Sequence, residues 1–191
     1  MLTLPNFLTL LRIIAIPVFL ICLMGGRYGG ALILFVAAAL TDTIDGALAR
    51  IMDSRSELGA VLDPLADKLL QVSSFIVLAS IGAIPYWLLV IVISRDVVIL
   101  TGYAAIYFVS GEAMKVAPTT LGKVSTFFQL FTIGFAVTSL ARPDLPMAMG
   151  NTLIQYCTGV TSAASGLQYV YSGLLYYQRA SGPTGAKEKE R

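Results

Sequence analysis

Residues 41–68 read TDTIDGALARIMDSRSELGAVLDPLADK and carry four aspartates, Asp42, Asp45, Asp63 and Asp67, between strongly apolar segments. Acidic side chains within membrane-grade sequence are costly to keep charged and mark functional sites. Their oxygen atoms are the ligands that divalent cations such as Mg²⁺ prefer. This stretch therefore predicts a metal site between membrane-spanning helices.

The composition of the whole chain is typical of a polytopic membrane protein. Of 191 residues, 57% are hydrophobic and 13% are charged, and the mean hydropathy is +0.79. A bilayer core takes about 20 apolar residues per helix, and six stretches qualify: 6–23, 30–49, 65–81, 87–109, 121–140 and 152–177. We expect an all-α integral membrane protein, a six-transmembrane-helix bundle that forms one domain over residues 1–180. Residues 181–191 should be a disordered cytoplasmic tail.

Lysine and arginine placement predicts the orientation of these helices. Basic residues follow the second and fourth stretches and fill the carboxyl-terminal tail, whereas the opposite loops hold Arg27 and Arg142. Both termini and the aspartate cluster are therefore assigned to the cytoplasmic side. The first stretch has no basic segment before it and contains Arg12, so we expect a retained helix and no cleaved signal peptide.

The side-chain inventory restricts the chemistry that the chain can perform. Histidine is absent, which excludes histidine-ligated zinc or haem and leaves a carboxylate or a less usual group as the general base. Cys22 and Cys157 lie in apolar stretches without paired spacing, so they are expected to be core residues.

Helical spacing gathers small and acidic residues on one face of the second stretch. At about 100° per residue, Asp42, Asp45, Gly46 and Ala49 fall within one arc of the helix. Two carboxylates thus lie beside two positions with almost no side chain, which permits close approach on this face.

The third stretch repeats this pattern with a spacing of four residues. Gly59, Asp63 and Asp67 form one stripe if the helix begins by Gly59. A later start would make Asp63 the N-cap and Pro64 the first helical residue, and the sequence permits both. In either case Asp63 and Asp67 point the same way.

Four carboxylates at this depth need compensation. Two Mg²⁺ or Mn²⁺ ions held by Asp42, Asp45, Asp63 and Asp67 would neutralise them, and oxygen-only ligation favours these hard ions over zinc or copper. A binuclear site of this kind suits in-line phosphoryl displacement. The alternative is a set of surface salt bridges with Arg50, Arg55 and Lys68, which leaves the glycine and alanine positions unexplained.

The pattern Asp42-x-x-Asp45-Gly46-x-x-Ala49-Arg50, eight residues, Gly59-x-x-x-Asp63-x-x-x-Asp67 resembles the complete signature of the CDP-alcohol phosphatidyltransferase family. The entry to the first helix, Asn6-x-x-Thr9-x-x-Arg12, is similar to the amino terminus of that family. The resemblance extends to the length and to the expected six helices.

This resemblance implies transfer of a phosphatidyl group from CDP-diacylglycerol to an alcohol, with release of CMP. It implies that Asp42, Asp45 and Asp63 bind two metal ions, and that Asp67 contacts metal and removes the proton of the acceptor hydroxyl. The residues that it assigns to the CDP moiety are Asn6, Thr9, Asp42, Gly46, Ala49, Arg50 and Gly59.

The acceptor is indicated by cations outside the motif. Arg95 and Asp96 lie in the middle of the fourth stretch, and Lys123 opens the fifth. Arg95, Lys123 and Arg12 are predicted to bind a phosphate on the acceptor. An internal Arg95–Asp96 pair or a structural link between helices is the alternative.

A phosphorylated acceptor favours glycerol 3-phosphate, the acceptor of a phosphatidylglycerophosphate synthase. The segments LPNFLTLLR and LDPLADKLL resemble the branch that contains both the phosphatidylglycerophosphate synthases and the CMP-forming cardiolipin synthases. The segments ISRDV and PTTLGKV lean toward the CMP-forming cardiolipin synthases, whose acceptor is phosphatidylglycerol, and other alcohols stay open. A cation or proton transporter is a remote alternative, because the acidic residues lie toward one leaflet and no internal repeat is visible.

The remaining expectations concern partners and packing. A homodimer in a bacterial inner (plasma) membrane, with no nucleic-acid partner, agrees with the family resemblance. Gly159, Gly166 and Gly173 recur every seven residues, which predicts a seam for close packing of the last helix or a dimer face. Tyr169 and neighbouring tyrosines are typical of an interfacial aromatic belt.

Overall fold

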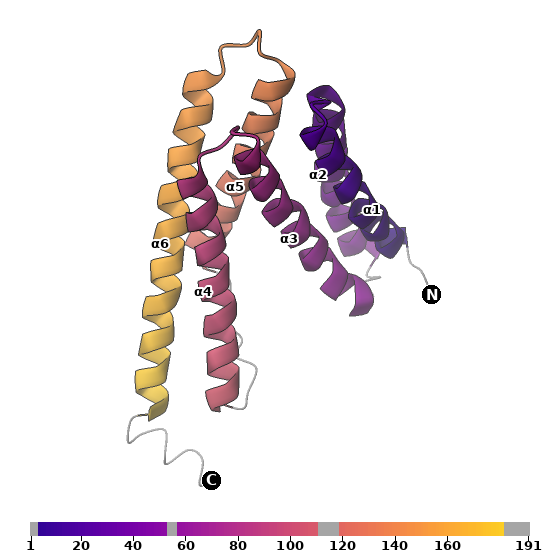
Figure 1. Cartoon of the computed structure of the whole chain (residues 1–191). Coiled ribbons are helices and arrows are strands. Elements are labelled where there is room, and N and C mark those ends of the chain that lie inside the picture. The colour runs from indigo at the N-terminus through magenta and orange to yellow at the C-terminus, as the bar shows by residue number, and fades with distance from the viewer. Residues whose placement is uncertain (1–3, 53–56, 111–118, 182–191) are drawn as a thin grey trace. The chain divides into compact units, whose positions relative to one another are not determined.

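The computed structural model describes the backbone of residues 4–52, 57–110 and 119–181, and the side chains of residues 10–41, 62–105 and 119–175. All regular structure in these ranges is helical (Figure 1). The helices are α1 (Leu4–Met24), α2 (Tyr28–Met52), α3 (Glu57–Ser80), α4 (Tyr86–Ser110), α5 (Thr120–Ala141) and α6 (Ala148–Ser181). The all-α prediction is confirmed for the described residues.

Each predicted apolar stretch lies in a separate helix, and the differences are at the ends. Helix α3 begins at Glu57, eight residues before the predicted apolar stretch, because Pro64 is accommodated inside the helix. Helix α6 begins at Ala148, before the predicted residue 152. The predicted tail lies outside the described residues except for Ser181, which ends α6.

The residues group into two compact units, and the prediction of a single domain stays a prediction. The first unit comprises Met1–Pro85 and Leu130–Ile154, and the second comprises Tyr86–Gln129 and Gln155–Arg191. Helices α5 and α6 therefore contribute residues to both units.

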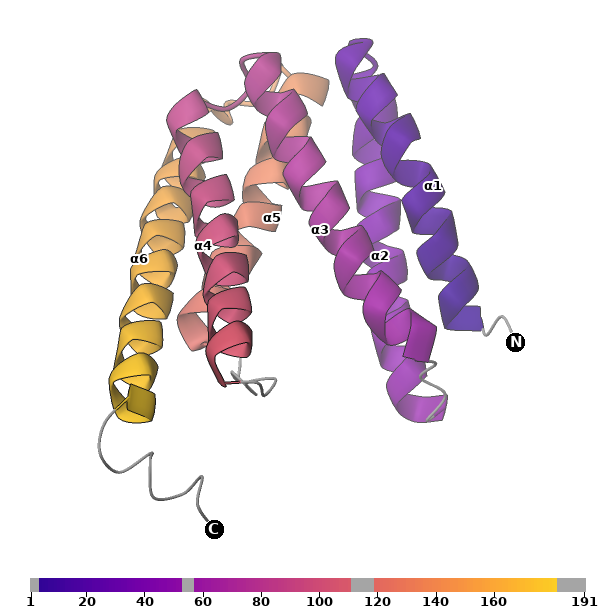
Figure 2. The ribbon, with the colours of Figure 1, turned by 60° about the horizontal axis from the view of Figure 1, so that its bottom comes forward.

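In the first unit, α1 packs against both α2 and α3 (Figure 2). Phe19 on α1 lies with its ring centroid 6.1 Å from that of Phe35 on α2. The turn after α1 closes through Gly26, whose φ of 70° is available to glycine without steric cost. The Gly26 and Arg27 amides donate to carbonyl oxygens of the last turn, as in a Schellman motif.

Polar side chains fill the interior of the second unit. Ser125 on α5 and Ser162 on α6 lie 3.0 Å apart between their hydroxyl oxygens, and the Gln129 amide donates to Ser162 at 2.9 Å. The Thr158 hydroxyl donates to the carbonyl oxygen of Phe128 at 3.0 Å. These four polar side chains are fully buried.

Large apolar side chains of the same unit point outward. Leu167 is 71% exposed, and Val160 on the same helix is exposed to a similar degree. A water-soluble amphipathic helix has the opposite arrangement, with its apolar stripe buried. The arrangement of α6 therefore suits a helix whose surroundings are hydrocarbon.

Helix length and composition agree with this interpretation in part of the chain. Among the described residues, Tyr86–Ala105 and Thr120–Ala141 are long and apolar enough to cross a membrane. Helices α1 and α2 contain shorter apolar runs, Leu10–Met24 and Tyr28–Thr41. The prediction of six spans goes beyond these findings.

Two of the three glycines in the predicted α6 seam lie against α4. A Cβ atom on Gly159 would lie 2.6 Å from a ring carbon of Trp87, and one on Gly166 would lie 3.6 Å from Cγ of Arg95. A Cβ on Gly173 would meet no described atom within 4 Å. The seam prediction thus holds at Gly159 and Gly166, which bring α4 and α6 together.

We expect Gly159→Ala to destabilise the protein, because the new methyl group must displace the Trp87 ring. Overpacking of this kind costs about 1–3 kcal/mol, which corresponds to a fall in Tm of about 3–8 °C for a chain of this size. Thermal unfolding in detergent measures it. Gly173→Ala is the matched control on the same helix, and equal Tm values for the two variants would contradict the proposed contact.

Candidate active site

Helix α2 carries the first half of the aspartate signature. The helix is continuous from Tyr28 to Met52, so Asp42 and Asp45 are less than one turn apart on a regular backbone. This continuity is the premise on which the prediction of a shared face rests. The side chains of residues 42–61 lie outside the described part of the structure, and their roles stay predictions.

Helix α3 carries the second half, and its start settles an alternative that the sequence leaves open. Because α3 begins at Glu57, Gly59, Asp63 and Asp67 are separated by successive turns of one helix. Asp63 is therefore not an N-cap, and Pro64 lies inside the helix. The Asp63 side chain is half-buried and that of Asp67 is 53% exposed.

Arg12 and Asp67 form an ion pair between α1 and α3. Nη1 of Arg12 donates to Oδ1 of Asp67 at 2.8 Å. The Arg12 side chain is 3% exposed, so its charge is buried whereas its partner reaches the surface. The salt-bridge alternative for the aspartates did not include Arg12. The prediction that Arg12 binds the acceptor phosphate is not tested by this contact.

A second ion pair lies in the other unit. Nη1 of Arg95 donates to Oδ1 of Asp96 at 3.0 Å, and both side chains are about nine-tenths buried, at 10% and 8% exposure. The Arg95 guanidinium also donates to the Ser165 hydroxyl from Nε and Nη2, at 3.4 Å in each case. The Arg95–Asp96 pairing left open by the sequence is thus present, together with a link to α6.

The guanidinium of Arg95 lies at the amino-terminal end of α5. A Cβ atom on Gly122 would lie 3.3 Å from Nη2 of Arg95 and 3.4 Å from the Tyr169 hydroxyl. The Thr119 hydroxyl accepts a bond from the Gly122 amide at 3.1 Å and thereby caps the helix. Helix amino termini favour anions. The Arg95 guanidinium, paired with Asp96, thus lies beside a helix end that favours anions.

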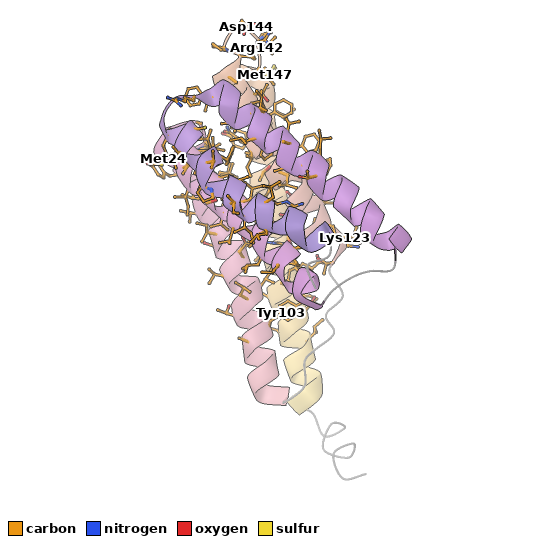
Figure 3. The ribbon with its side chains drawn as sticks, turned by 90° about the vertical axis from the view of Figure 1, so that its right-hand side faces the viewer. Met24, Tyr103, Lys123, Arg142, Asp144 and Met147 are labelled. Atoms are coloured by element: carbon orange, nitrogen blue, oxygen red, sulfur yellow. The ribbon has the colours of Figure 1, made fainter. Side chains whose placement is uncertain are left out.

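Lys123 occupies the first turn of α5 and is exposed (Figure 3). It directly follows Gly122, so a second cation lies in the same turn as the Arg95 contact. The structure therefore places the two predicted acceptor residues Arg95 and Lys123 at the same helix end.

Three residues of this helix end were missed or given another role by the sequence interpretation. Thr119 was noted only as part of the segment PTTLGKV, Ser165 was not singled out, and Tyr169 was assigned to an aromatic belt. The segment Thr119-Thr120-Leu121-Gly122 contains an N-cap residue three positions before the Gly122 amide, which was a usable signal for Thr119. No sequence signal marks Ser165 or Tyr169, because only the packing of α6 brings them to this position.

The predicted nucleotide residues are placed by their helices alone. Asn6 and Thr9 lie in the first turns of α1, and Gly46, Ala49 and Arg50 lie in α2. The surroundings of these residues and of Gly59 are outside the ranges in which side chains are described. The described side chains, which do not include those of Asp42 and Asp45, contain no group of three metal-ligating residues.

Arg142 and Asp144 form a third ion pair in the turn between α5 and α6 (Figure 3). Nε of Arg142 donates to Oδ1 of Asp144 at 3.2 Å. This hydrogen bond and a second one from a backbone amide lower the pKa of the Asp144 carboxyl below its usual value. The ion pair is therefore fully formed at a pH above the usual pKa of aspartate, and it is lost as the pH falls through the lowered pKa. Its exposure marks it as a surface contact.

Comparison with known proteins identifies the class of this helical protein. Residues 2–165 match the CDP-alcohol phosphatidyltransferase family. The chain is 34% identical over 183 residues to a probable phosphatidylglycerophosphate synthase of Mycobacterium tuberculosis H37Rv, covering 93% of this chain and 81% of the relative. It is 35% identical over 164 residues to the CDP-diacylglycerol–glycerol-3-phosphate 3-phosphatidyltransferase of Bacillus subtilis 168, with 78% and 81% covered.

A third relative has another acceptor in its name. A probable cardiolipin synthase (CMP-forming) of Drosophila melanogaster is 36% identical over 188 residues, with 88% of this chain and 56% of the relative covered. The fold and these relatives define a helical phosphatidyltransferase, an enzyme of phospholipid biosynthesis. The chain belongs to the CDP-alcohol phosphatidyltransferase family. Together with the two long apolar helices, this membership indicates a membrane protein.

We expect Asp96→Ala to lower stability strongly, because it leaves the Arg95 charge buried without its carboxylate partner. Breaking a buried pair costs about 3–5 kcal/mol, or a fall in Tm of roughly 10 °C. Asp144→Ala removes the same group from an exposed pair and should move the Tm by no more than about 2 °C. Thermal unfolding of the two variants side by side measures the difference, and similar Tm values would contradict the burial of the Arg95–Asp96 pair.

Proposed function

We propose that this enzyme transfers the phosphatidyl group of CDP-diacylglycerol to glycerol 3-phosphate and releases CMP. The observation that carries this proposal is the complete aspartate signature on α2 and α3, in which Asp63 and Asp67 lie one turn apart with Asp67 half-exposed. Two relatives that are matched over most of their length have names that specify this type of product or acceptor.

Two divalent metal ions, Mg²⁺ or Mn²⁺, would be held by the carboxylates of Asp42, Asp45, Asp63 and Asp67. These ligands suit Mg²⁺ or Mn²⁺ because all four donors are oxygen atoms. The half-buried Asp63 and the half-exposed Asp67 lie on successive turns of one helix. When bound, the ions polarise the pyrophosphate and stabilise the charge on departing CMP.

Asp67 acts as the general base in this proposal. The acceptor hydroxyl oxygen bonds to the phosphorus that carries the diacylglycerol, the bond from that phosphorus to the bridging pyrophosphate oxygen breaks, and CMP leaves with the electron pair. The hydroxyl proton passes to the Asp67 carboxylate. A base must reach the proton that it removes, and 53% exposure of the Asp67 side chain leaves it accessible to a ligand.

The CDP moiety is assigned to residues of α1, α2 and the start of α3. Gly46 lacks a Cβ and permits a flat base to approach α2, whereas the Arg50 guanidinium matches two phosphate oxygens. The full set of proposed donor residues is Asn6, Thr9, Asp42, Gly46, Ala49, Arg50 and Gly59.

Arg95 and Lys123 are proposed to bind the phosphate of the acceptor. The support is the amino-terminal end of α5, where the Arg95 guanidinium lies close to Gly122 and Lys123 is exposed in the same turn. Phosphatidylglycerol, the acceptor of a CMP-forming cardiolipin synthase, is the second candidate, because a relative of that name is 36% identical. Family membership favours either transferase over a cation or proton transporter.

The proposed setting is a six-span homodimer in a bacterial inner membrane, with both termini and the active site on the cytoplasmic side. The basic residues that follow α2 and α4 in the sequence support the orientation, and the outward-facing apolar side chains support the membrane setting. The homodimer is proposed from the family resemblance alone. Membrane lipids surround the helices in this arrangement, and soluble acceptors reach the site from the cytoplasm.

We expect purified protein to release CMP from CDP-diacylglycerol and Mg²⁺ when glycerol 3-phosphate is added, but not with phosphatidylglycerol. Chromatographic detection of CMP and of the lipid product measures this. Asp67→Asn is the blank, since an amide does not take the proton, and EDTA should abolish release until Mg²⁺ is restored. Release with phosphatidylglycerol alone would make the enzyme a cardiolipin synthase.

We expect Lys123→Gln to raise KM for glycerol 3-phosphate about tenfold or more, because charged hydrogen bonds to phosphate contribute about 1.5–3 kcal/mol. KM for CDP-diacylglycerol should stay within about twofold. Arg27→Gln, which removes an exposed cation from the α1–α2 turn, is the control. Equal changes in the two KM values would remove Lys123 from the acceptor site.

A further inference from the structure

Arg12 interrupts a buried apolar stripe on α1. The next positions on the same side of the helix are Ile16, Phe19 and Leu23, and all three are buried. An apolar side chain at position 12 would extend this stripe at no cost in desolvation. Burying a guanidinium instead is expensive. The contact that this arginine makes with Asp67, at 2.8 Å, is therefore the feature that needs explanation.

We propose that Arg12 is a positioning residue that fixes the orientation of the Asp67 carboxylate for removal of the acceptor proton. The inference rests on the proposed function of Asp67. A half-exposed aspartate on a helix surface has several rotamers available. The hydrogen bond from a guanidinium that is itself held by burial on α1 selects one of them.

The asymmetry of burial supports this role for Arg12. The arginine is 3% exposed and the aspartate is 53% exposed, so the anchored end of the pair is the cation and the accessible end is the carboxylate. A contact that served stability alone would be replaceable by well-packed apolar residues. A general base, by contrast, must be a carboxylate that the substrate can reach and that a rigid neighbour holds in place.

Direct binding of the acceptor phosphate by Arg12 is the competing role, and its geometry is less favourable. A phosphate from solution would have to reach a side chain with 3% exposure whose Nη1 already donates to Asp67. The two roles have different kinetic consequences. Loss of a phosphate ligand raises the acceptor KM, whereas loss of orientation lowers kcat while substrates still bind.

The test is a set of kinetic constants for Arg12→Met and Arg12→Lys, with Arg27→Lys in the exposed α1–α2 turn as the control. We expect Arg12→Met to lower kcat about 100-fold, as displacement of a catalytic group by about 1 Å does, with both KM values within threefold. Arg12→Lys should recover part of the loss, because lysine keeps the charge without the planar fork. In an Asp67→Asn background, Arg12→Met should cause no further loss.

A binding measurement separates orientation from assembly of the site. The rise in Tm on addition of Mg²⁺ and CDP should be the same in Arg12→Lys as in the wild type, whereas Asp63→Asn should lose it. Loss of this shift in Arg12→Lys would overturn the proposal. So would a raised acceptor KM at unchanged kcat, which would assign Arg12 to the phosphate.

Misfolding of a variant and an error in the proposed function give different experimental results. If Arg12→Met does not fold, Arg12→Lys with wild-type kcat overturns the positioning role by itself. If the wild type releases no CMP with glycerol 3-phosphate or phosphatidylglycerol, the proposed function fails, and the role of Arg12 fails with it.

Discussion

Compensation of buried charge is the constraint on which this structure depends. An ionised side chain between apolar helices is stable only when an opposite charge or several hydrogen bonds lie within reach. Among the side chains that the structure describes, Arg12 pairs with Asp67 in the first unit and Arg95 pairs with Asp96 in the second. The Arg12 side chain is buried and that of Arg95 is largely buried, and both lie on helices that carry predicted site residues. The charges that we propose for chemistry and acceptor binding are thus also charges that the packing of the helices must accommodate.

Buried neutral polar groups in the second unit are subject to a similar constraint, because each needs a hydrogen-bond partner. Ser125, Gln129 and Ser162 satisfy one another between α5 and α6, while leucine and valine side chains of α6 point outward. Between helices in lipid, hydrogen bonds and close contacts replace the hydrophobic effect as the source of specificity. Gly159 provides the close contact with α4, and the hydrogen-bonded side chains fix how α6 is rotated. That rotation brings Ser165 to the Arg95 guanidinium.

The sequence was sufficient for the helices and for the spacing of the signature, because both are local properties. Apolar stretches predicted where each helix lies, and the four-residue spacing of Asp63 and Asp67 became one turn of α3. The early start of α3 was left open, since Pro64 is compatible with a helix start as well as with an interior position. The partner of Arg12 was not predictable, because Asp67 lies 55 positions away and nothing local specifies which face of α1 meets α3.

The Arg95–Asp96 pair explains how a guanidinium persists in a largely buried position on α4. An uncompensated guanidinium with 10% exposure would cost too much to keep, so Asp96 holds the charge in place. With that charge matched, the attraction for an anion comes from Lys123 and from the amino terminus of α5, which adds about half a positive charge. In the proposed acceptor site, a phosphate would bind without depending on an uncompensated arginine. Arg95 would contribute directional hydrogen bonds, and the exposed Lys123 would contribute the net charge.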